Sequence, residues 1–443
     1  MSLLSKFKND PLFTKVIRSS GSLFSNTTIS MGLSVVQSIM ATRLLGPAGY
    51  GLIGLVMAFP ATINSIFSFR MNEVIVRYGG DYLNKQEKEK AAALLKAAGL
   101  TEAAVSLLAF LVVLFTASLA ETYSAKTPGT AWMFTVFAIG LLANFNTETS
   151  TGILQITGRI RLLGVINLIQ SIFTLLIITG AFFLNGTLVT VLIAYLVGKT
   201  ILGLGMFFTA QVQIHKALGS GWWRHSFSVL DTWREIFHFA ISSNISATII
   251  KIFRESEVLW VAFFIDTTAV GYYRVAYNLV YFLALPSDPL IHVTFPEISR
   301  LVTEKAWSKL KSFLKKITTL SLAYNILLGA AYIFLGRWII LIFSGEKFVN
   351  AYPALVALTI GLVFNYILFW NRPLLLTLGL PEFPIYITLV SGFIKLALSF
   401  WLVPMYGIFA AGALLSYYYI TSVGIMALRG VRQIQHNENS THH

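Results

Sequence analysis

The residues of this sequence that could do chemistry are charged and amide side chains inside long apolar segments. The segment 237–263 holds the largest group, namely Asn244, Thr248, Lys251, Arg254, Glu255 and Glu257. Positions 244, 248, 251 and 255 recur every three or four residues, so on a helix they share one face. Pairs one turn apart, Lys251–Glu255 and Arg254–Glu257, could neutralise the charges, but they leave the shared face unexplained. The spacing favours a face that lines a polar cavity.

Three further basic residues, Lys199, Arg274 and Lys395, lie deep in other apolar segments. A lysine or arginine at the centre of a bilayer costs about 2.5–3.5 kcal/mol, so such residues normally face a cavity or a partner. A diphosphate in a low dielectric needs close positive partners, and convergence of these residues would provide them. The other interpretation is that Lys199 and Lys395 pair with Glu102 and other acids. The candidate substrate-binding residues are Lys251, Arg254, Arg274, Lys199, Lys395 and Asn244.

A second group of residues is suited to gating or ion coupling. The segment 268–296 contains Pro286 and Pro289, and proline inside a helix removes backbone hydrogen bonds and kinks it, which predicts a hinge. Asp288 and His292, one helical turn apart, could hold a proton or a cation. Three other charged residues stand near segment ends, where a structural salt bridge or a gate is the expected role. The candidate gate or ion-coupling residues are Arg70, Glu73, Glu148, Asp288 and His292.

Cofactor chemistry is not indicated. The run Gly198-Lys199-Thr200 looks like the end of a phosphate-binding loop, but Ile193 stands where that motif requires glycine. The run also lies inside an apolar segment rather than between a strand and a helix. The chain has no cysteine, which excludes disulfides and thiolate metal sites. We expect no enzymatic activity, no cofactor and no metal, with H⁺ or Na⁺ as the expected coupling ion.

The elements that must position these residues are membrane-spanning helices. The 443 residues are 56% hydrophobic and only 12% charged, whereas soluble domains carry about 25% charged residues. Apolar segments long enough to cross a bilayer predict an all-α polytopic membrane protein. We predict twelve transmembrane helices, at 20–44, 48–70, 91–119, 130–151, 161–184, 187–210, 237–263, 268–296, 312–336, 350–371, 383–403 and 406–428.

The distribution of lysine and arginine sets the expected orientation. With the N-terminus inside, most of the 33 Lys and Arg residues fall in cytoplasmic loops, and the opposite loops carry only Arg43, Lys126, Arg337 and Lys347. This bias is the one that cytoplasmic loops show in multi-pass proteins. It also explains the net charge of +14 through contact with anionic lipid rather than nucleic acid. We expect both termini in the cytoplasm and the protein in the inner membrane.

Two six-helix lobes are the expected organisation, with an N-lobe at 1–210 and a C-lobe at 237–443. The intervening segment 211–236 is rich in tryptophan and arginine, which is typical of a linker lying in the headgroup region. Gly49-Tyr50 and Gly271-Tyr272 open the second and eighth predicted spans, and Gly158 and Gly379 recur at nearly the same offset. Such a duplication predicts lobes related by a pseudo-two-fold axis along the membrane normal.

Two motifs carry a resemblance to a known family. The run Arg43-Leu44-Leu45-Gly46-Pro47-Ala48-Gly49-Tyr50-Gly51 resembles the Arg-x-Leu-Gly-x-x-x-Tyr-Gly loop of polysaccharide flippases. These are the O-antigen and capsular repeat-unit flippases of the multidrug/oligosaccharidyl-lipid/polysaccharide exporter superfamily. Phe295-Pro296-Glu297-Ile298-Ser299-Arg300 resembles the Pro-x-x-Ser-Arg end of their eighth span. The resemblance implies a V-shaped pair of lobes around a central cavity, which moves lipid-linked sugars by alternating access.

The resemblance and the charges together suggest an ion-coupled flippase for an undecaprenyl-diphosphate-linked oligosaccharide, such as an O-antigen repeat unit. Its expected partners are that substrate, membrane lipids, a polysaccharide polymerase and chain-length machinery. The alternative is a cation-coupled multidrug exporter of the same superfamily, which would have an acidic or apolar cavity. A sugar transporter of the major facilitator type is excluded because residues 78–85 lack its Gly-x-x-x-Asp-Arg-x-Gly-Arg loop. Short outer loops exclude a membrane glycosyltransferase.

Overall fold

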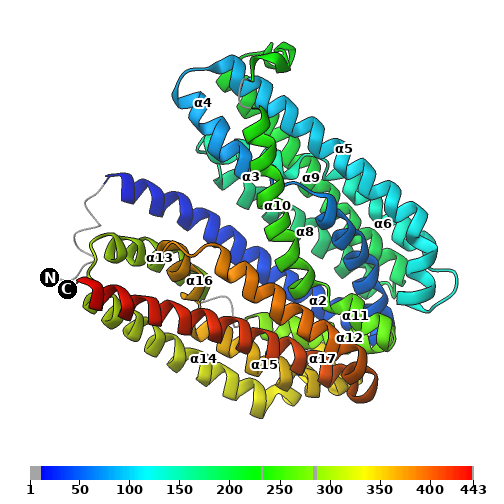
Figure 1. Cartoon of the computed structure of the whole chain (residues 1–443). Coiled ribbons are helices and arrows are strands. Elements are labelled where there is room, and N and C mark those ends of the chain that lie inside the picture. The colour runs from blue at the N-terminus through cyan, green and yellow to red at the C-terminus, as the bar shows by residue number, and fades with distance from the viewer. Residues whose placement is uncertain (1–10, 231–232, 283–286, 442–443) are drawn as a thin grey trace. The chain divides into compact units, whose positions relative to one another are not determined.

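The computed structural model of the chain is helical, and no strand occurs in the part that it describes (Figure 1). The description covers the backbone at 11–230, 233–282 and 287–441. Within those ranges it leaves out the side chains of 11–25, 27, 242–247, 249–251, 254–255, 287–293 and 440–441. The predicted all-α class is therefore confirmed.

The described chain divides into two compact units. The first unit comprises Met1–Leu45, Val56–Thr122 and Thr127–Thr248, and the second comprises Gly46–Leu55, Tyr123–Lys126 and Ile249–His443. The predicted linker, 211–236, falls within the first unit, and the predicted lobe boundaries stay predictions. Two short N-terminal segments belong to the second unit, which a division by sequence position does not foresee.

The longest helices contain a break where the sequence predicts two spans. Helix α2 (Pro11–Phe67) includes Gly46 at φ 67° and ψ −177°, between the predicted spans 20–44 and 48–70. Helix α17 (Glu382–Thr441) includes Gly407 at φ 61° and ψ −144°, after the predicted span 383–403 and at the start of the predicted span 406–428. Glycine reaches a positive φ without the steric cost that a β-carbon brings. Each of these helices therefore carries two predicted spans on either side of a glycine turn.

The other elements of the first unit follow the predicted segments closely. They are α3 (Met71–Val74), η1 (Ile75–Gly79), α4 (Gly80–Asn84), α5 (Lys88–Ala120), α6 (Ala131–Ala143), α7 (Thr147–Ile156), α8 (Arg161–Phe183), α9 (Leu188–Leu218), η3 (Trp222–Arg224) and η4 (Phe227–Val229). The short η2 (Glu121–Ala125) begins in the first unit and ends in the second. Helix α10 (Trp233–Glu255) begins in this unit. Helices α8 and α9 pack together, as do α5 and α6.

The second unit continues in the same manner. Its helices are α11 (Glu257–Phe264), α12 (Thr267–Tyr281), α13 (Ser287–Thr303), α14 (Trp307–Ser344), η6 (Glu346–Ala351), α15 (Tyr352–Ile367) and α16 (Asn371–Thr377), followed by α17. Helix α15 packs against α17, α14 and α12. Two separate helices, α12 and α13, cover the predicted hinge segment 268–296, whose Pro286 lies outside the described residues.

Seven helical stretches of the described chain are long and apolar enough to cross a membrane. They are Thr28–Phe67, Lys88–Ala125, Arg161–Phe183, Leu188–Leu218, Trp307–Ser344, Glu346–Thr377 and Glu382–Asn439. The predicted spans at 130–151, 237–263 and 268–296 fall on pairs of shorter helices, α6 with α7, α10 with α11 and α12 with α13. The count of twelve spans and the pseudo-two-fold axis stay predictions.

Gly51, next to the Gly49-Tyr50 pair of the predicted repeat, and Gly271 lie against each other in the second unit. A β-carbon added to Gly51 would collide with the carbonyl oxygen of Thr267, and one added to Gly271 would collide with that of Pro47. The rings of Tyr50 and Tyr272 both stand edge-on to Phe348, with centroids 6.2 and 6.1 Å away. This contact joins the segment Gly46–Leu55 to α12 backbone against backbone.

Candidate functional site

Several candidate residues of the sequence cannot be placed by their side chains. Those of Asn244, Lys251 and Arg254 on α10, and of Asp288 and His292 on α13, lie outside the described residues. Their assignments stay predictions. The neighbouring residue of the predicted polar face, Thr248, is described, and its hydroxyl donates to the carbonyl oxygen of Ser65 at 3.0 Å.

Lys395 forms a buried ion pair inside the second unit. Its side chain on α17 is 2% exposed and contacts the carboxylate of Glu257, at the start of α11. The same ammonium donates to the carbonyl oxygen of Phe253 at 2.6 Å and lies 5.6 Å from the ring centre of Tyr418. This is the pairing with an acid that the sequence offered as the alternative to substrate binding. The pair ties α17 to α11 and neutralises both charges.

Arg274 on α12 is held differently, over an aromatic ring. Its guanidinium carbon lies 4.9 Å from the centre of the Tyr50 ring. The absence of a side chain at Gly54 makes room for it, because a β-carbon there would lie 2.8 Å from Nη1 of Arg274. The hydroxyl of Tyr50 accepts a hydrogen bond from Asn278 Nδ2 at 3.2 Å. A cation over a ring face keeps its charge while it gains a favourable contact.

Lys199, on α9 of the first unit, also lies over an aromatic ring, as Arg274 does. Its ammonium lies 5.4 Å from the centre of the Phe137 ring, and its aliphatic chain packs against Gly140. Its backbone carbonyl accepts a hydrogen bond from Asn144 Nδ2 at 2.9 Å, at the point where α6 ends. Lys199 thus lies beside the break between α6 and α7.

The acid expected beside Lys199, Glu102, is engaged with the N-terminus of α7. Its two carboxylate oxygens accept hydrogen bonds from the backbone N–H groups of Glu148 and Thr149, each at 2.8 Å. A carboxylate at a helix N-terminus is favoured by the orphan donors and by the helix dipole. Glu102 therefore fixes the start of α7, and the backbone of the candidate gate residue Glu148 is part of that contact.

The candidate gate residues Arg70 and Glu73 pair with each other at the start of α3, in an exposed ion pair. A second exposed group lies in the second unit, where Arg300 pairs with Glu297 at 2.6 Å and with Glu304 at 2.8 Å. The hydrogen bonds from Arg300 hold the pKa of Glu297 below its usual value.

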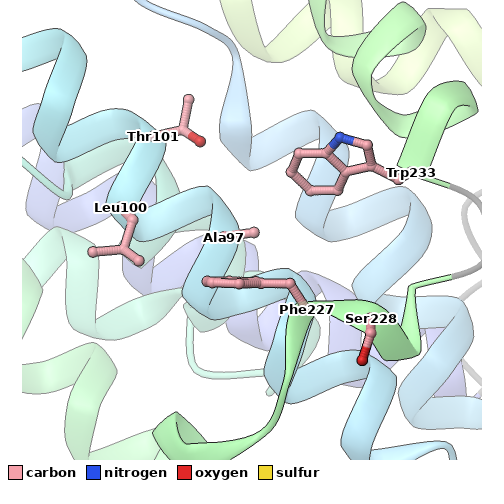
Figure 2. A pocket seen from close by; sticks show the side chains of 6 residues that line it. All are labelled: Ala97, Leu100, Thr101, Phe227, Ser228 and Trp233. Carbon is pink, nitrogen blue, oxygen red and sulfur yellow. The ribbon is translucent and has the colours of Figure 1, made fainter.

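A surface groove of about 500 Å³ in the first unit was not foreseen as a site. Figure 2 shows Ala97, Leu100 and Thr101 of α5 on one side, with the rings of Phe227 and Trp233 beside them. The ammonium of Lys96, next to Ala97, lies 4.5 Å from the centre of the Phe227 ring. An apolar groove beside a cation suits a lipid chain with an anionic headgroup. Its only signal in the sequence was the aromatic, basic composition of 211–236.

Metal chemistry has no visible support in the described part of the chain. No group of three or more His, Asp or Glu residues there could hold a metal ion.

Comparison with known proteins gives the family and the fold. A family model described as "Polysaccharide biosynthesis protein" matches residues 16–302. No curated protein sequence matches the chain significantly. Among solved structures, an inward-facing multidrug resistance MATE family transporter of the MOP superfamily is similar, with a TM-score of 0.73 and 14% identity. The similarity covers 93% of this chain and 96% of that one.

Two further structures of transporters are similar over nearly their whole length. The lipid II flippase MurJ, in an inward closed conformation, gives a TM-score of 0.70 at 16% identity and covers 94% of this chain and 90% of its own. A MOP superfamily transporter from Pyrococcus furiosus Vc1 gives 0.63 at 13% identity, with 96% of each chain covered. The family model matches more than half of the chain, and the similar structures share its helical architecture. The chain therefore belongs to the polysaccharide biosynthesis protein family and has the fold of MOP superfamily transporters.

Proposed function

We propose that the protein is a flippase that carries an undecaprenyl-diphosphate-linked oligosaccharide from the cytoplasmic to the periplasmic leaflet of the inner membrane. The observation that carries this proposal is the family match over 16–302 on a chain with a transporter fold. Transport proceeds by alternating access and makes or breaks no covalent bond. The protein's task is to shield the sugars and the diphosphate from hydrocarbon while the lipid chain stays in the bilayer.

The cations inside the predicted spans support an anionic substrate. Arg274 and Lys199 are held over the rings of Tyr50 and Phe137, an arrangement that retains a positive charge within the membrane. A diphosphate in a low dielectric interacts strongly with such groups. Lys395 supports the proposal less, because Glu257 neutralises it. Lys251 and Arg254 are proposed to complete the set of substrate contacts.

The groove lined by Phe227 and Trp233 supports the proposal because it suits the lipid part of the substrate. Its walls are mainly apolar, and Lys96 stands at its edge. An isoprenoid chain could rest there while its diphosphate contacts the lysine. The groove belongs to the segment that the Lys/Arg distribution places on the cytoplasmic side, where the substrate is loaded.

Export of cationic drugs is the second candidate function, favoured by the likeness to a multidrug resistance MATE family transporter. At 14% identity this likeness concerns the fold alone. The family match to polysaccharide biosynthesis proteins favours the flippase. H⁺ or Na⁺ coupling and contact with a polysaccharide polymerase belong to the proposal.

The two functions are separated by deleting the gene in its host. A flippase deletion is expected to remove the surface polysaccharide and to leave lipid-linked saccharide on the inner leaflet, with unchanged drug tolerance. Complementation with the wild-type gene serves as the control. A normal polysaccharide coat combined with new sensitivity to cationic drugs would contradict the flippase assignment and support the exporter.

A further inference from the structure

The second unit contains a cavity of about 600 Å³, and none of the candidate residues whose side chains are described lines it. Its walls come from α13, α15, α16 and α17, together with Tyr281, the last residue of α12. The volume falls within the range of about 300–1,000 Å³ that small-molecule sites occupy. The cavity belongs to the second unit alone, so it does not depend on contacts with the first.

Aromatic rings form much of the lining. The rings are those of Tyr281, Phe295, Tyr366, Phe369, Tyr418 and Tyr419. Tyr281 and Phe295 are partly exposed, whereas the other four are buried. Flat apolar faces of this kind accept the C–H faces of a sugar ring as readily as they accept hydrocarbon.

Polar side chains on the same walls favour a sugar over a hydrocarbon chain as the ligand. Asn371 donates to the carbonyl oxygen of Leu368 at 2.7 Å, and its Oδ1 retains acceptor capacity. Ser422 donates to its own helix, and its oxygen can still accept. Neither Asn365 nor the buried Thr388 makes a side-chain hydrogen bond to any described residue. Their polar atoms can therefore bond to the hydroxyls of a ligand, which a hydrocarbon chain does not carry.

The charge of the lining favours an anion. Arg372, in the first turn of α16, is exposed, and it is the one charged side chain among the described lining residues. A guanidinium binds phosphate oxygens through paired hydrogen bonds. The cavity is thus aromatic and hydrogen-bonding, with one cationic group on its wall.

We propose that this cavity binds the glycan of a lipid-linked saccharide within the second unit. The sugar rings lie against the tyrosine and phenylalanine faces, and their hydroxyls bond to Asn365, Asn371 and Thr388. Arg372 binds the diphosphate that joins sugar to lipid. The inference rests on the proposed function and deepens it, because it assigns recognition of the sugar to named residues of the second unit.

The test compares two lipids that differ only in the sugar. The full chain is placed in phosphatidylcholine nanodiscs, and its affinity is measured for undecaprenyl diphosphate and for undecaprenyl diphosphate carrying one N-acetylglucosamine. The wild-type protein is expected to prefer the glycosylated lipid. Asn365→Leu combined with Thr388→Val is expected to reduce this preference about tenfold, as suits the loss of two hydrogen bonds, without changing affinity for the sugarless lipid.

Matched variants separate the sugar from the diphosphate. Arg372→Gln is expected to weaken both lipids alike. Thr421→Val removes a hydroxyl from the same helix, α17, where it bonds only to that helix's own carbonyl oxygens. It should change neither affinity. For Thr421→Val and for Asn365→Leu with Thr388→Val, an unchanged affinity for the sugarless lipid also reports correct folding, and for Arg372→Gln an unchanged thermal unfolding temperature does so.

Each of the other outcomes contradicts either the glycan site or the proposed function. If both lipids bind and the sugar preference survives Asn365→Leu with Thr388→Val, the glycan site is wrong and the flippase proposal stands. The same holds if the wild type shows no preference, or if phosphatidylglycerol competes equally with the glycosylated lipid. If neither undecaprenyl lipid binds the wild type, the proposed function fails and the glycan site fails with it.

Discussion

At the scale of single residues, the buried pair of Lys395 and Glu257 has the clearest energetic consequence. Both side chains are almost fully buried, and they join α17 to α11. Removing one member of a buried pair leaves an uncompensated charge and costs about 3–5 kcal/mol, whereas removing both is often neutral. The pair should therefore behave as a unit in mutagenesis.

We expect Lys395→Met to destabilise the protein by about 3 kcal/mol or more, because Glu257 then has no buried cation. Adding Glu257→Leu should restore most of the lost stability. Thermal unfolding of the purified chain, compared across the two single variants and the double variant, measures this coupling. Single variants as stable as the wild type, or a double variant worse than either, would refute the structural role of the pair.

The exposed pair of Glu297 and Arg300 predicts a pH effect of known sign. Hydrogen bonds from Arg300 lower the pKa of Glu297, so the pair contributes stability above the unfolded pKa of about 4.3. That contribution is lost as the pH falls through the lower folded pKa. The effect is small because the pair is largely exposed.

The corresponding experiment compares the wild type with Arg300→Gln. The variant should unfold at a lower temperature than the wild type at pH 7, and the difference should shrink as the medium is acidified below pH 4. A difference that grows on acidification would show that the sign of the Glu297 shift is wrong.

At the scale of helices, close backbone contact between glycines joins Gly46–Leu55 to α12. A β-carbon at Gly271 would collide with the carbonyl oxygen of Pro47. A backbone oxygen cannot move away as the end of a flexible side chain can. Small residues are what allow helices in membranes to approach this closely. The contact between the two Gly-Tyr segments is therefore sensitive to a single methyl group.

We expect Gly271→Ala to destabilise the protein by about 1–3 kcal/mol, the usual cost of overpacking. Gly180→Ala on α8 is the matched control, since nothing lies within 4 Å of a β-carbon there. It should be neutral or slightly stabilising, as alanine favours helix over glycine. Melting temperatures of the two variants check the prediction, which fails if they shift equally.

Helices were the part of the structure that the sequence predicted best. Hydropathy predicted segments that the helices follow, and Gly46 and Gly407 mark breaks where two spans were expected. The sequence did not predict that Gly46–Leu55 belongs to the second unit. Hydropathy is a property of one segment at a time and does not say which helices pack together.

The candidate site could be predicted only in part, because residues that meet in it are distant in sequence. Lys395 was found because a lysine in an apolar segment is costly, but its partner Glu257 is distant in sequence. The nearer partner considered for Glu257 was Arg254. No sequence pattern predicted the cavity of the second unit, since its polar residues lie in four separate stretches from Asn365 to Ser422 and each is ordinary alone.

At the scale of the whole molecule, the chain belongs to the polysaccharide biosynthesis protein family and has the fold of known transporters. The two units divide the candidate residues between them. Lys199 and Glu148 lie in the first, and Arg274 and Lys395 lie in the second.

Translocation itself tests this account most directly. The full chain is reconstituted in liposomes with undecaprenyl-diphosphate-linked N-acetylglucosamine, and a sugar-binding lectin reports how much lipid reaches the opposite leaflet. We predict protein-dependent translocation that falls at least about tenfold in Arg274→Gln and is unchanged in Arg337→Gln, an exposed arginine on α14. No translocation by the wild type, together with efflux of a cationic dye from the same liposomes, would contradict the flippase assignment.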